Sequence, residues 1–143
     1  MVLRDITFVH PKARSGSAKI WVCLEYPKCD SYVGCHHGTT IPLGRLANKN
    51  LRELRKKAHK AFDPIWQSGL VSRKEAYEWL SDMLHLTKNT CHLGLFGEEM
   101  CLKVISLCEE QTNDLILCYK EKHGLRPRKL PRHGRRRRSR KHR

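Results

Sequence analysis

Residues 47–66 read ANKNLRELRKKAHKAFDPIW, and this segment predicts a helix with one apolar and one basic face. The apolar side chains recur at helical spacings, as expected of a helix that packs against a core. They are Leu51, Leu54, Ala58, Phe62 and Ile65. Basic side chains follow at steps of three, four and four residues, at Lys49, Arg52, Lys56 and Lys60. We expect Asp63-Pro64 to bend or end the helix, because proline lacks an amide donor.

Two more helices are predicted further along the chain. The sequence SRKE at 72–75 is a capping box that opens a helix to about His85. Its inward residues are expected to be Ala76, Leu80, Met83 and Leu84. After a loop at 89–96, another helix should begin at residue 97 or 98, and its pattern can continue through Leu115 and Cys118. The buried stripe of that helix is predicted to hold Met100, Val104 and Leu107 or Cys108.

The segment before residue 47 predicts a small β-ribbon. Three runs contain β-forming residues, at 2–9, 19–23 and 30–34, and a turn-like stretch with Pro11 and Gly16 separates the first two. The fold class is therefore expected to be α+β, a β-ribbon packed on three to four helices. We expect 1–46 to form the ribbon and its following loop, 47–122 the helical part of the same domain, and 123–143 a tail.

Positive charge is concentrated in that tail. The chain of 143 residues carries 29 Lys and Arg and 14 Asp and Glu, a formal charge of +15. The stretch 126–143 holds 11 of the cations and no acid, which leaves 1–125 with a net charge of only +4. We expect a disordered arm, since a cationic segment with one leucine and no aromatic residue cannot form a core. Its cations are Arg126, Arg128, Lys129, Arg132, Arg135, Arg136, Arg137, Arg138, Arg140, Lys141 and Arg143.

An arm of this kind favours a nucleic-acid partner, DNA or RNA. Arginines that meet phosphates release condensed counterions, which makes binding salt-dependent and nearly blind to sequence. The plainer alternative is a solvated tail that only aids solubility. The basic face at Lys49, Arg52, Lys56 and Lys60 could likewise be a second phosphate-binding surface or simply a solvated helix face.

The lengths of the apolar runs and the use of cysteine argue against membrane-spanning, secreted and disulfide-rich proteins. No apolar run approaches the roughly 18 residues of a membrane helix, and the first residues lack the apolar centre of a signal peptide. We therefore expect no membrane association and a cytoplasmic location, the host cytoplasm if the gene belongs to a phage. Seven cysteines without an export signal argue against a disulfide framework and for reduced thiols, mostly buried.

The pair Cys23 and Cys29 is a candidate metal site. Two thiolates at the turn of a β-ribbon can share one zinc ion, and turn amides can hydrogen-bond to their sulfurs. A tetrahedral site needs two more ligands. The nearest candidates are Cys35, His36 and His37.

At this point the chain resembles a known family. WVCLEYPKCDSYVG at 21–34 is similar to the second half of a topoisomerase-type zinc ribbon. With PLGRLAN at 42–48, AHKAFDPIW at 58–66, SRKEAYEWL at 72–80 and CHLGLF at 91–96, it resembles an uncharacterised zinc-finger-containing domain family of bacteriophages and prophages. The resemblance covers about residues 2–108 and excludes the arginine tail. It implies a zinc ribbon packed on helices and little about activity.

The chain departs from that family at one point. Typical relatives begin with an upstream C-x2-C pair that completes the zinc site with the residues matching Cys23 and Cys29. Here residues 1–22 contain no cysteine, and His10 is their one plausible ligand. Three explanations stay open: the site has lost zinc, it recruits Cys35 or His37, or the true start codon lies upstream.

Three function classes compete at this stage. The first is a non-catalytic nucleic-acid-binding protein of phage type, and the second is a protein-interaction factor acting on a host or phage nucleoprotein complex. The third is a metal-dependent nuclease, for which no paired-acid motif or phosphate-cradling loop is present. Its available groups would be His36, His37, His59, Asp63 and His92. We expect no enzyme activity.

Overall fold

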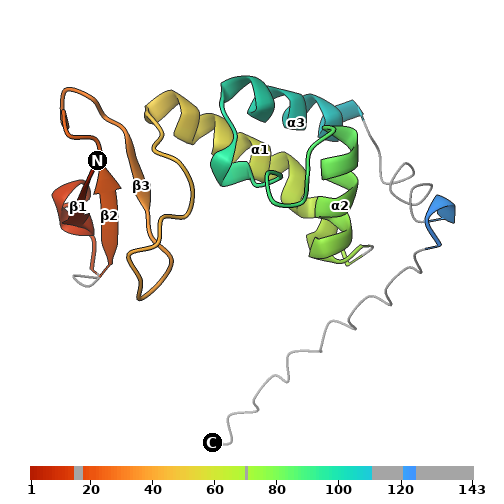
Figure 1. Cartoon of the computed structure of the whole chain (residues 1–143), viewed down its shortest axis with the longest axis horizontal. Coiled ribbons are helices and arrows are strands. Elements are labelled where there is room, and N and C mark those ends of the chain that lie inside the picture. The colour runs from red at the N-terminus through yellow and green to blue at the C-terminus, as the bar shows by residue number, and fades with distance from the viewer. Residues whose placement is uncertain (15–17, 70, 111–120, 125–143) are drawn as a thin grey trace, which may run out of the picture.

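A computed structural model describes residues 1–14, 18–69, 71–110 and 121–124. Within these residues the chain forms a three-stranded antiparallel sheet followed by three α-helices, which confirms the α+β class. Figure 1 shows the sheet at one end of α1 (Lys49–Gln67), while α2 (Arg73–Met83) and α3 (Glu98–Glu110) lie along the other half of that helix. The predicted continuation through Leu115 and Cys118 and the arginine tail lie outside the described residues.

The sheet pairs its strands in chain order, β1 (Val2–Asp5), β2 (Lys19–Val22) and β3 (Tyr32–Gly34). The prediction of one strand over 2–9 is wrong beyond Asp5, where Ile6–Phe8 forms a 3₁₀ turn (η1). The amides of Val9 and His10 both donate to the Ile6 carbonyl, at 3.2 and 2.9 Å, and so turn the chain out of the sheet. The other two strands are shorter than predicted by one and two residues.

Helix α1 has the predicted amphipathic pattern. Its amino end is capped by Asn48, whose side chain accepts a hydrogen bond from the Leu51 amide at 2.9 Å. The helix runs to Gln67, one residue past the predicted 47–66 segment. Asp63-Pro64 therefore does not end it, because the proline removes only its own donor. The Ser68 amide still donates to the Pro64 carbonyl at 2.9 Å, and the chain leaves the helix at Gly69, where φ is +79°.

The two later helices begin as predicted and differ in which residues they bury. The capping box between Ser72 and Glu75 is confirmed. Trp79 is buried beside Leu80, whereas Met83 is exposed, because the space between the end of α2 and α3 is an open cavity rather than core. In α3 the fully buried residues are Cys101 and Val104, so the stripe is centred on Cys101 and not on Met100. A short 3₁₀ turn, η2 (Leu93–Leu95), lies in the predicted 89–96 loop.

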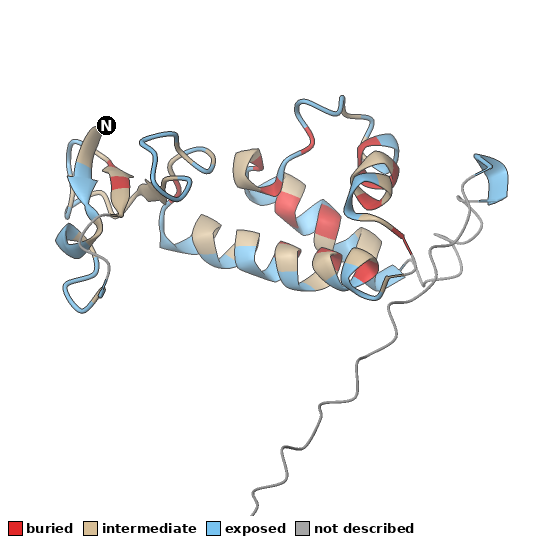
Figure 2. Cartoon of the chain, turned by 90° about the horizontal axis from the view of Figure 1, so that it is seen from below, coloured by how far each residue is buried: buried red, intermediate tan, exposed pale blue. Residues whose placement is uncertain are grey.

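The main core lies where the three helices meet (Figure 2). The ribbon has a smaller buried set of its own, Ile20, Val22 and Ala47, outside that cluster. The two parts touch through the loop after β3, where the Arg45 amide donates to the Gly94 carbonyl at 3.0 Å. Among the described residues, no helix combines the length and apolar character that a membrane crossing requires.

Candidate functional site

The turn between β2 and β3 carries the predicted cysteine pair. The Cys23 amide donates to the Ser31 carbonyl at 2.9 Å, and the Cys29 amide donates to the Glu25 carbonyl at 3.0 Å. These hydrogen bonds turn the segment 23–29 back on itself. Hydrogen bonds from Ser31, and then from the Cys23 side chain, hold the pKa of the Cys29 thiol below its usual value. The turn therefore brings two thiols together and favours the thiolate form that binds metals.

Cys35 and His37 do not join this pair. The Cys35 amide donates to the Lys19 carbonyl at 3.3 Å, which places Cys35 beside the first residue of β2, while Cys23 follows the last one. Four strand residues span roughly 13 Å, and ligands of one zinc ion lie about 2.3 Å from the metal. The structure thus does not support the recruitment of Cys35 or His37 to the Cys23 turn. Burial raises the pKa of Cys35, which also disfavours a ligating thiolate.

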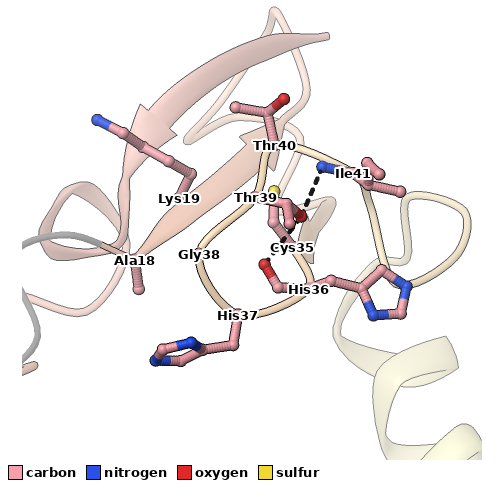
Figure 3. Close-up of a pocket in the computed structure, with 9 residues that line it drawn as sticks. All are labelled: Ala18, Lys19, Cys35, His36, His37, Gly38, Thr39, Thr40 and Ile41. Carbon is pink, nitrogen blue, oxygen red and sulfur yellow. Dashed lines mark hydrogen bonds between the residues drawn. The ribbon is translucent and has the colours of Figure 1, made fainter.

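The loop after β3 does not form a second metal centre. Figure 3 shows the rings of His36 and His37 pointing away from each other, with Cys35 beneath Thr39. The loop lines a cavity of about 660 Å³, and two of the polar groups around it already have partners. Thr39 Oγ1 accepts from the Ile41 amide at 3.1 Å, and the Lys19 ammonium contacts Asp5 at 2.6 Å. Across the described residues, no three His, Cys, Asp or Glu side chains group closely enough to hold a metal ion.

The strand register shows which part of β1 lies beside the cysteine pair. Val2 lies opposite Val22, so the amino end of β1 stands beside Cys23. Ligands placed before β1, as the resemblance implies for typical relatives, would therefore reach the Cys23 turn. His10 does not form a three-ligand group with the pair. Its ring lies edge-on to Tyr32 at a centroid distance of 5.4 Å.

The basic face of α1 separates into two kinds of residue. Lys49, Lys56 and Lys60 are exposed, and Lys56 contacts Glu53 at 2.8 Å. Arg52 instead joins the helix to the ribbon. Its guanidinium donates to the Asp30 carbonyl at 2.7 Å and lies 3.8 Å from the centroid of the Tyr32 ring. The cations of 126–143, predicted to bind nucleic acid, lie outside the described residues.

The groups considered for a nuclease are not assembled into one site. His59 Nδ1 lies 3.3 Å from both carboxylate oxygens of Asp63, one helical turn away. His92 contacts Tyr77 at a centroid distance of 6.1 Å, while His36 and His37 belong to the ribbon loop. A His–Asp pair on one helix is an ordinary polar contact, and the described residues give it no third metal-binding side chain.

Sequence reasoning missed one cluster, at the start of α2. Arg73, Lys74, Tyr77, Lys88 and His92 line a common cavity, and the guanidinium of Arg73 lies over two aromatic rings. The signal was present in the quoted segments SRKEAYEWL and CHLGLF, whose polar residues were read as capping and loop positions. Their convergence depends on how α2 packs against the 85–92 loop.

Comparison with known proteins agrees with the ribbon geometry. A family model described as a zinc-finger-containing domain matches residues 1–111. No curated protein and no solved structure matches the chain. The match covers the ribbon, all three described helices and the Cys23–Cys29 turn. The chain belongs to the zinc-finger-containing domain family.

Proposed function

We propose that the protein binds nucleic acid, DNA or RNA, without catalysis, and that the arginine-rich segment 126–143 supplies most of the affinity. The observation that carries this is the charge distribution. Eleven cations and no acid lie in 126–143, while the remaining chain has a net charge of +4. Backbone phosphates are the partner that such a segment binds most strongly, and membership of a zinc-finger family supports the same class of function.

The folded part contributes a smaller phosphate-facing surface on α1. Lys49, Lys56 and Lys60 lie on one side of the helix and are exposed. Arg52 fixes the ribbon to the same helix through Asp30 and Tyr32, so the ribbon and the lysines keep one orientation toward the nucleic acid. Contacts of this kind position a protein on the backbone and carry no sequence information.

Zinc has a structural role in this proposal. Cys23 and Cys29 supply two thiolates, and the described residues bring no third ligand to them. We expect chelation to lower the unfolding temperature of zinc-loaded protein. Cys23→Ser should remove that difference, whereas Cys35→Ser, at the other end of the sheet, should keep it. If chelation lowered the unfolding temperatures of the two variants equally, the assignment of zinc to the turn would be contradicted.

The experiment for binding is a salt titration against duplex DNA, single-stranded DNA and RNA. The logarithm of the affinity should fall linearly with the logarithm of salt concentration, with a slope of about −0.9 per duplex phosphate neutralised. Replacing Arg135, Arg136, Arg137 and Arg138 by Gln should reduce the slope by up to about 3–4 on duplex DNA. Flat affinity for all three polymers between low and moderate salt would overturn the proposal.

A second candidate is a protein-interaction factor within a host or phage nucleoprotein complex. Two large apolar side chains of the loop after β3 favour it, since Ile41 is 61% exposed and Leu43 is 56% exposed. The four-arginine variant separates the candidates, because an interaction factor keeps its protein partner and a simple nucleic-acid binder loses most of its affinity. Either role fits the proposed setting, a phage or prophage protein acting in the host cytoplasm.

A further inference from the structure

A second cationic site lies on the helical part, far along the chain from the arm. A cavity of about 220 Å³ opens between the first turns of α2 and the loop that follows the helix. That volume is below the roughly 300–1,000 Å³ of pockets for whole small molecules, and it suits a single charged group. Six residues line it, and each of them carries a polar group: Arg73, Lys74, Tyr77, Glu78, Lys88 and His92.

The charges of this lining are unbalanced. Glu78 is its one acid, and that carboxylate is already paired with the Lys88 ammonium at 2.8 Å. Arg73 and Lys74 form no ion pair with a carboxylate of the described residues. Both side chains are exposed at the mouth of the cavity. An anion entering it would thus meet two unpaired cations.

Aromatic contacts hold the Arg73 guanidinium in place. Its central carbon lies 5.0 Å from the Tyr77 ring centroid and 5.8 Å from that of Trp66. Tyr77 is in turn fixed edge-on against the buried Phe62 at 4.9 Å, and the Trp66 indole donates to Asp63 at 3.3 Å. A guanidinium held in this way still offers N–H groups that can form the paired hydrogen bonds that suit phosphate oxygens.

The helix terminus itself is not the binding element. The Glu75 amide donates to Ser72 Oγ at 3.2 Å, and the Ser72 amide donates to Glu75 Oε2 at 2.6 Å. The capping box thereby occupies the amides of Ser72 and Glu75. The cationic groups of this cavity belong to side chains, which substitution can test.

We propose that this pocket binds a phosphate group of a nucleic acid. Arg73 forms the paired hydrogen bonds, Lys74 adds a second unpaired cation, and Tyr77, Lys88 and His92 complete the lining. The inference rests on the proposed nucleic-acid function for its partner and adds a defined site on the folded part. The phosphate is either a terminal monoester or a backbone diester, which share this chemistry.

The test uses the full chain and inorganic phosphate at constant ionic strength, followed by amide NMR. Saturating shifts are expected at residues 73, 74, 77, 88 and 92, with chloride giving none. Lys74→Gln should weaken phosphate binding about tenfold, as expected for loss of one charge-assisted contact. Arg73→Gln should do the same, but Lys74 is the cleaner variant because it makes no aromatic contact.

Lys103→Gln is the matched control, because it removes the same charge from an exposed site on α3. It should leave phosphate affinity at the pocket unchanged. The proposed phosphate site would be overturned if Lys103→Gln and Lys74→Gln weakened phosphate binding equally. It would also be overturned if the pocket residues showed no saturating shift.

Short oligonucleotides with and without a 5′-phosphate then identify the source of the phosphate. Competition with inorganic phosphate only by the phosphorylated oligonucleotide assigns the terminal monoester, and competition by both assigns the backbone. Competition by neither overturns the inference. If the pocket residues show no shifts but the protein still binds polynucleotide in a salt-dependent way, only the pocket is refuted. If the shifts occur but that polynucleotide binding does not, only the proposed function is refuted.

Discussion

At the scale of single residues, the cysteines differ in their chemistry according to where the fold places them. Cys29 lies in the β2–β3 turn, where hydrogen bonds from Ser31 lower its pKa. Cys91 is buried beneath the helices, and this burial raises its pKa to about 11. Cys29 is therefore the more reactive thiol and Cys91 the more inert one.

Alkylation of metal-free protein should reveal this difference. A lowered pKa means that the thiolate forms at lower pH, so Cys29 should react with iodoacetamide at a lower pH than an ordinary thiol. Cys91 should stay unreactive up to about pH 11 in folded protein. Ser31→Ala should shift the reaction of Cys29 to higher pH, as read by mass spectrometry of the modified peptides. An unchanged pH profile in that variant would contradict the assigned role of Ser31.

Gly44 is a residue whose lack of a side chain permits a contact between the two parts of the fold. A Cβ atom at this position would lie 2.1 Å from the Gly94 carbonyl oxygen. Gly44→Ala should destabilise the protein by about 1–3 kcal/mol, because backbone would have to move on both sides. Gly34→Ala is the control, since its Cβ would meet only Leu43 Cδ1 at 3.5 Å. Thermal unfolding compares them, and equal midpoints would refute the close contact.

At the scale of elements, α1 has two separate tasks on its basic face. Arg52 contacts Asp30 and Tyr32 of the ribbon, while Lys56 faces solvent with only an exposed partner. Exposed ion pairs contribute about 0–1 kcal/mol, whereas a stacked guanidinium with several hydrogen bonds contributes more. Stability and nucleic-acid binding should therefore respond to different residues of one helix.

Two substitutions separate these tasks. Arg52→Lys keeps the charge and loses the planar fork, so it should lower stability by about 1–2 kcal/mol with little change in the salt slope of binding. Lys56→Gln should leave stability within about 0.5 kcal/mol and make the slope less steep. Urea unfolding and salt titration measure the two quantities. A reduced salt slope in Arg52→Lys with unchanged stability would reverse the assignment.

At the scale of the whole molecule, the fold has two unequal hydrophobic cores. The helical core includes Phe62, Trp79 and Leu93, whereas the ribbon buries little more than Ile20 and Val22. Local stability follows the amount of buried apolar surface. The ribbon should then open more easily than the helices when no metal is bound.

Native-state hydrogen exchange of metal-free protein tests this difference. Amides of β2 should exchange through openings of lower free energy than the amides around Phe62 and Val104. Zinc binding at the Cys23 turn should raise the protection of β2 and leave the helical core nearly unchanged, because a bound metal stabilises the part that holds it. Uniform protection of ribbon and helices without metal would show instead that the two parts unfold together.

The sequence predicted those features that depend on neighbours a few residues apart. The apolar spacing of α1, the Ser72–Glu75 capping box and the antiparallel ribbon all follow from local pattern, and the structure has each of them. The errors were local as well. Pro64 does not end α1, which was one of the two outcomes expected of it, and the predicted 2–9 strand includes residues that the Ile6 carbonyl draws into a turn.

Sequence alone also determined the family, the charge asymmetry and the cysteine pair of this protein, because composition and short spacings are properties of the chain itself. Only the tertiary structure decided that Arg52 serves the ribbon, that Cys35 lies away from Cys23, and that Arg73 and His92 share a cavity. Each of these arrangements involves residues that are about 10 to 20 or more positions apart in the sequence. They depend on strand register and helix packing, which spacing along the chain does not encode.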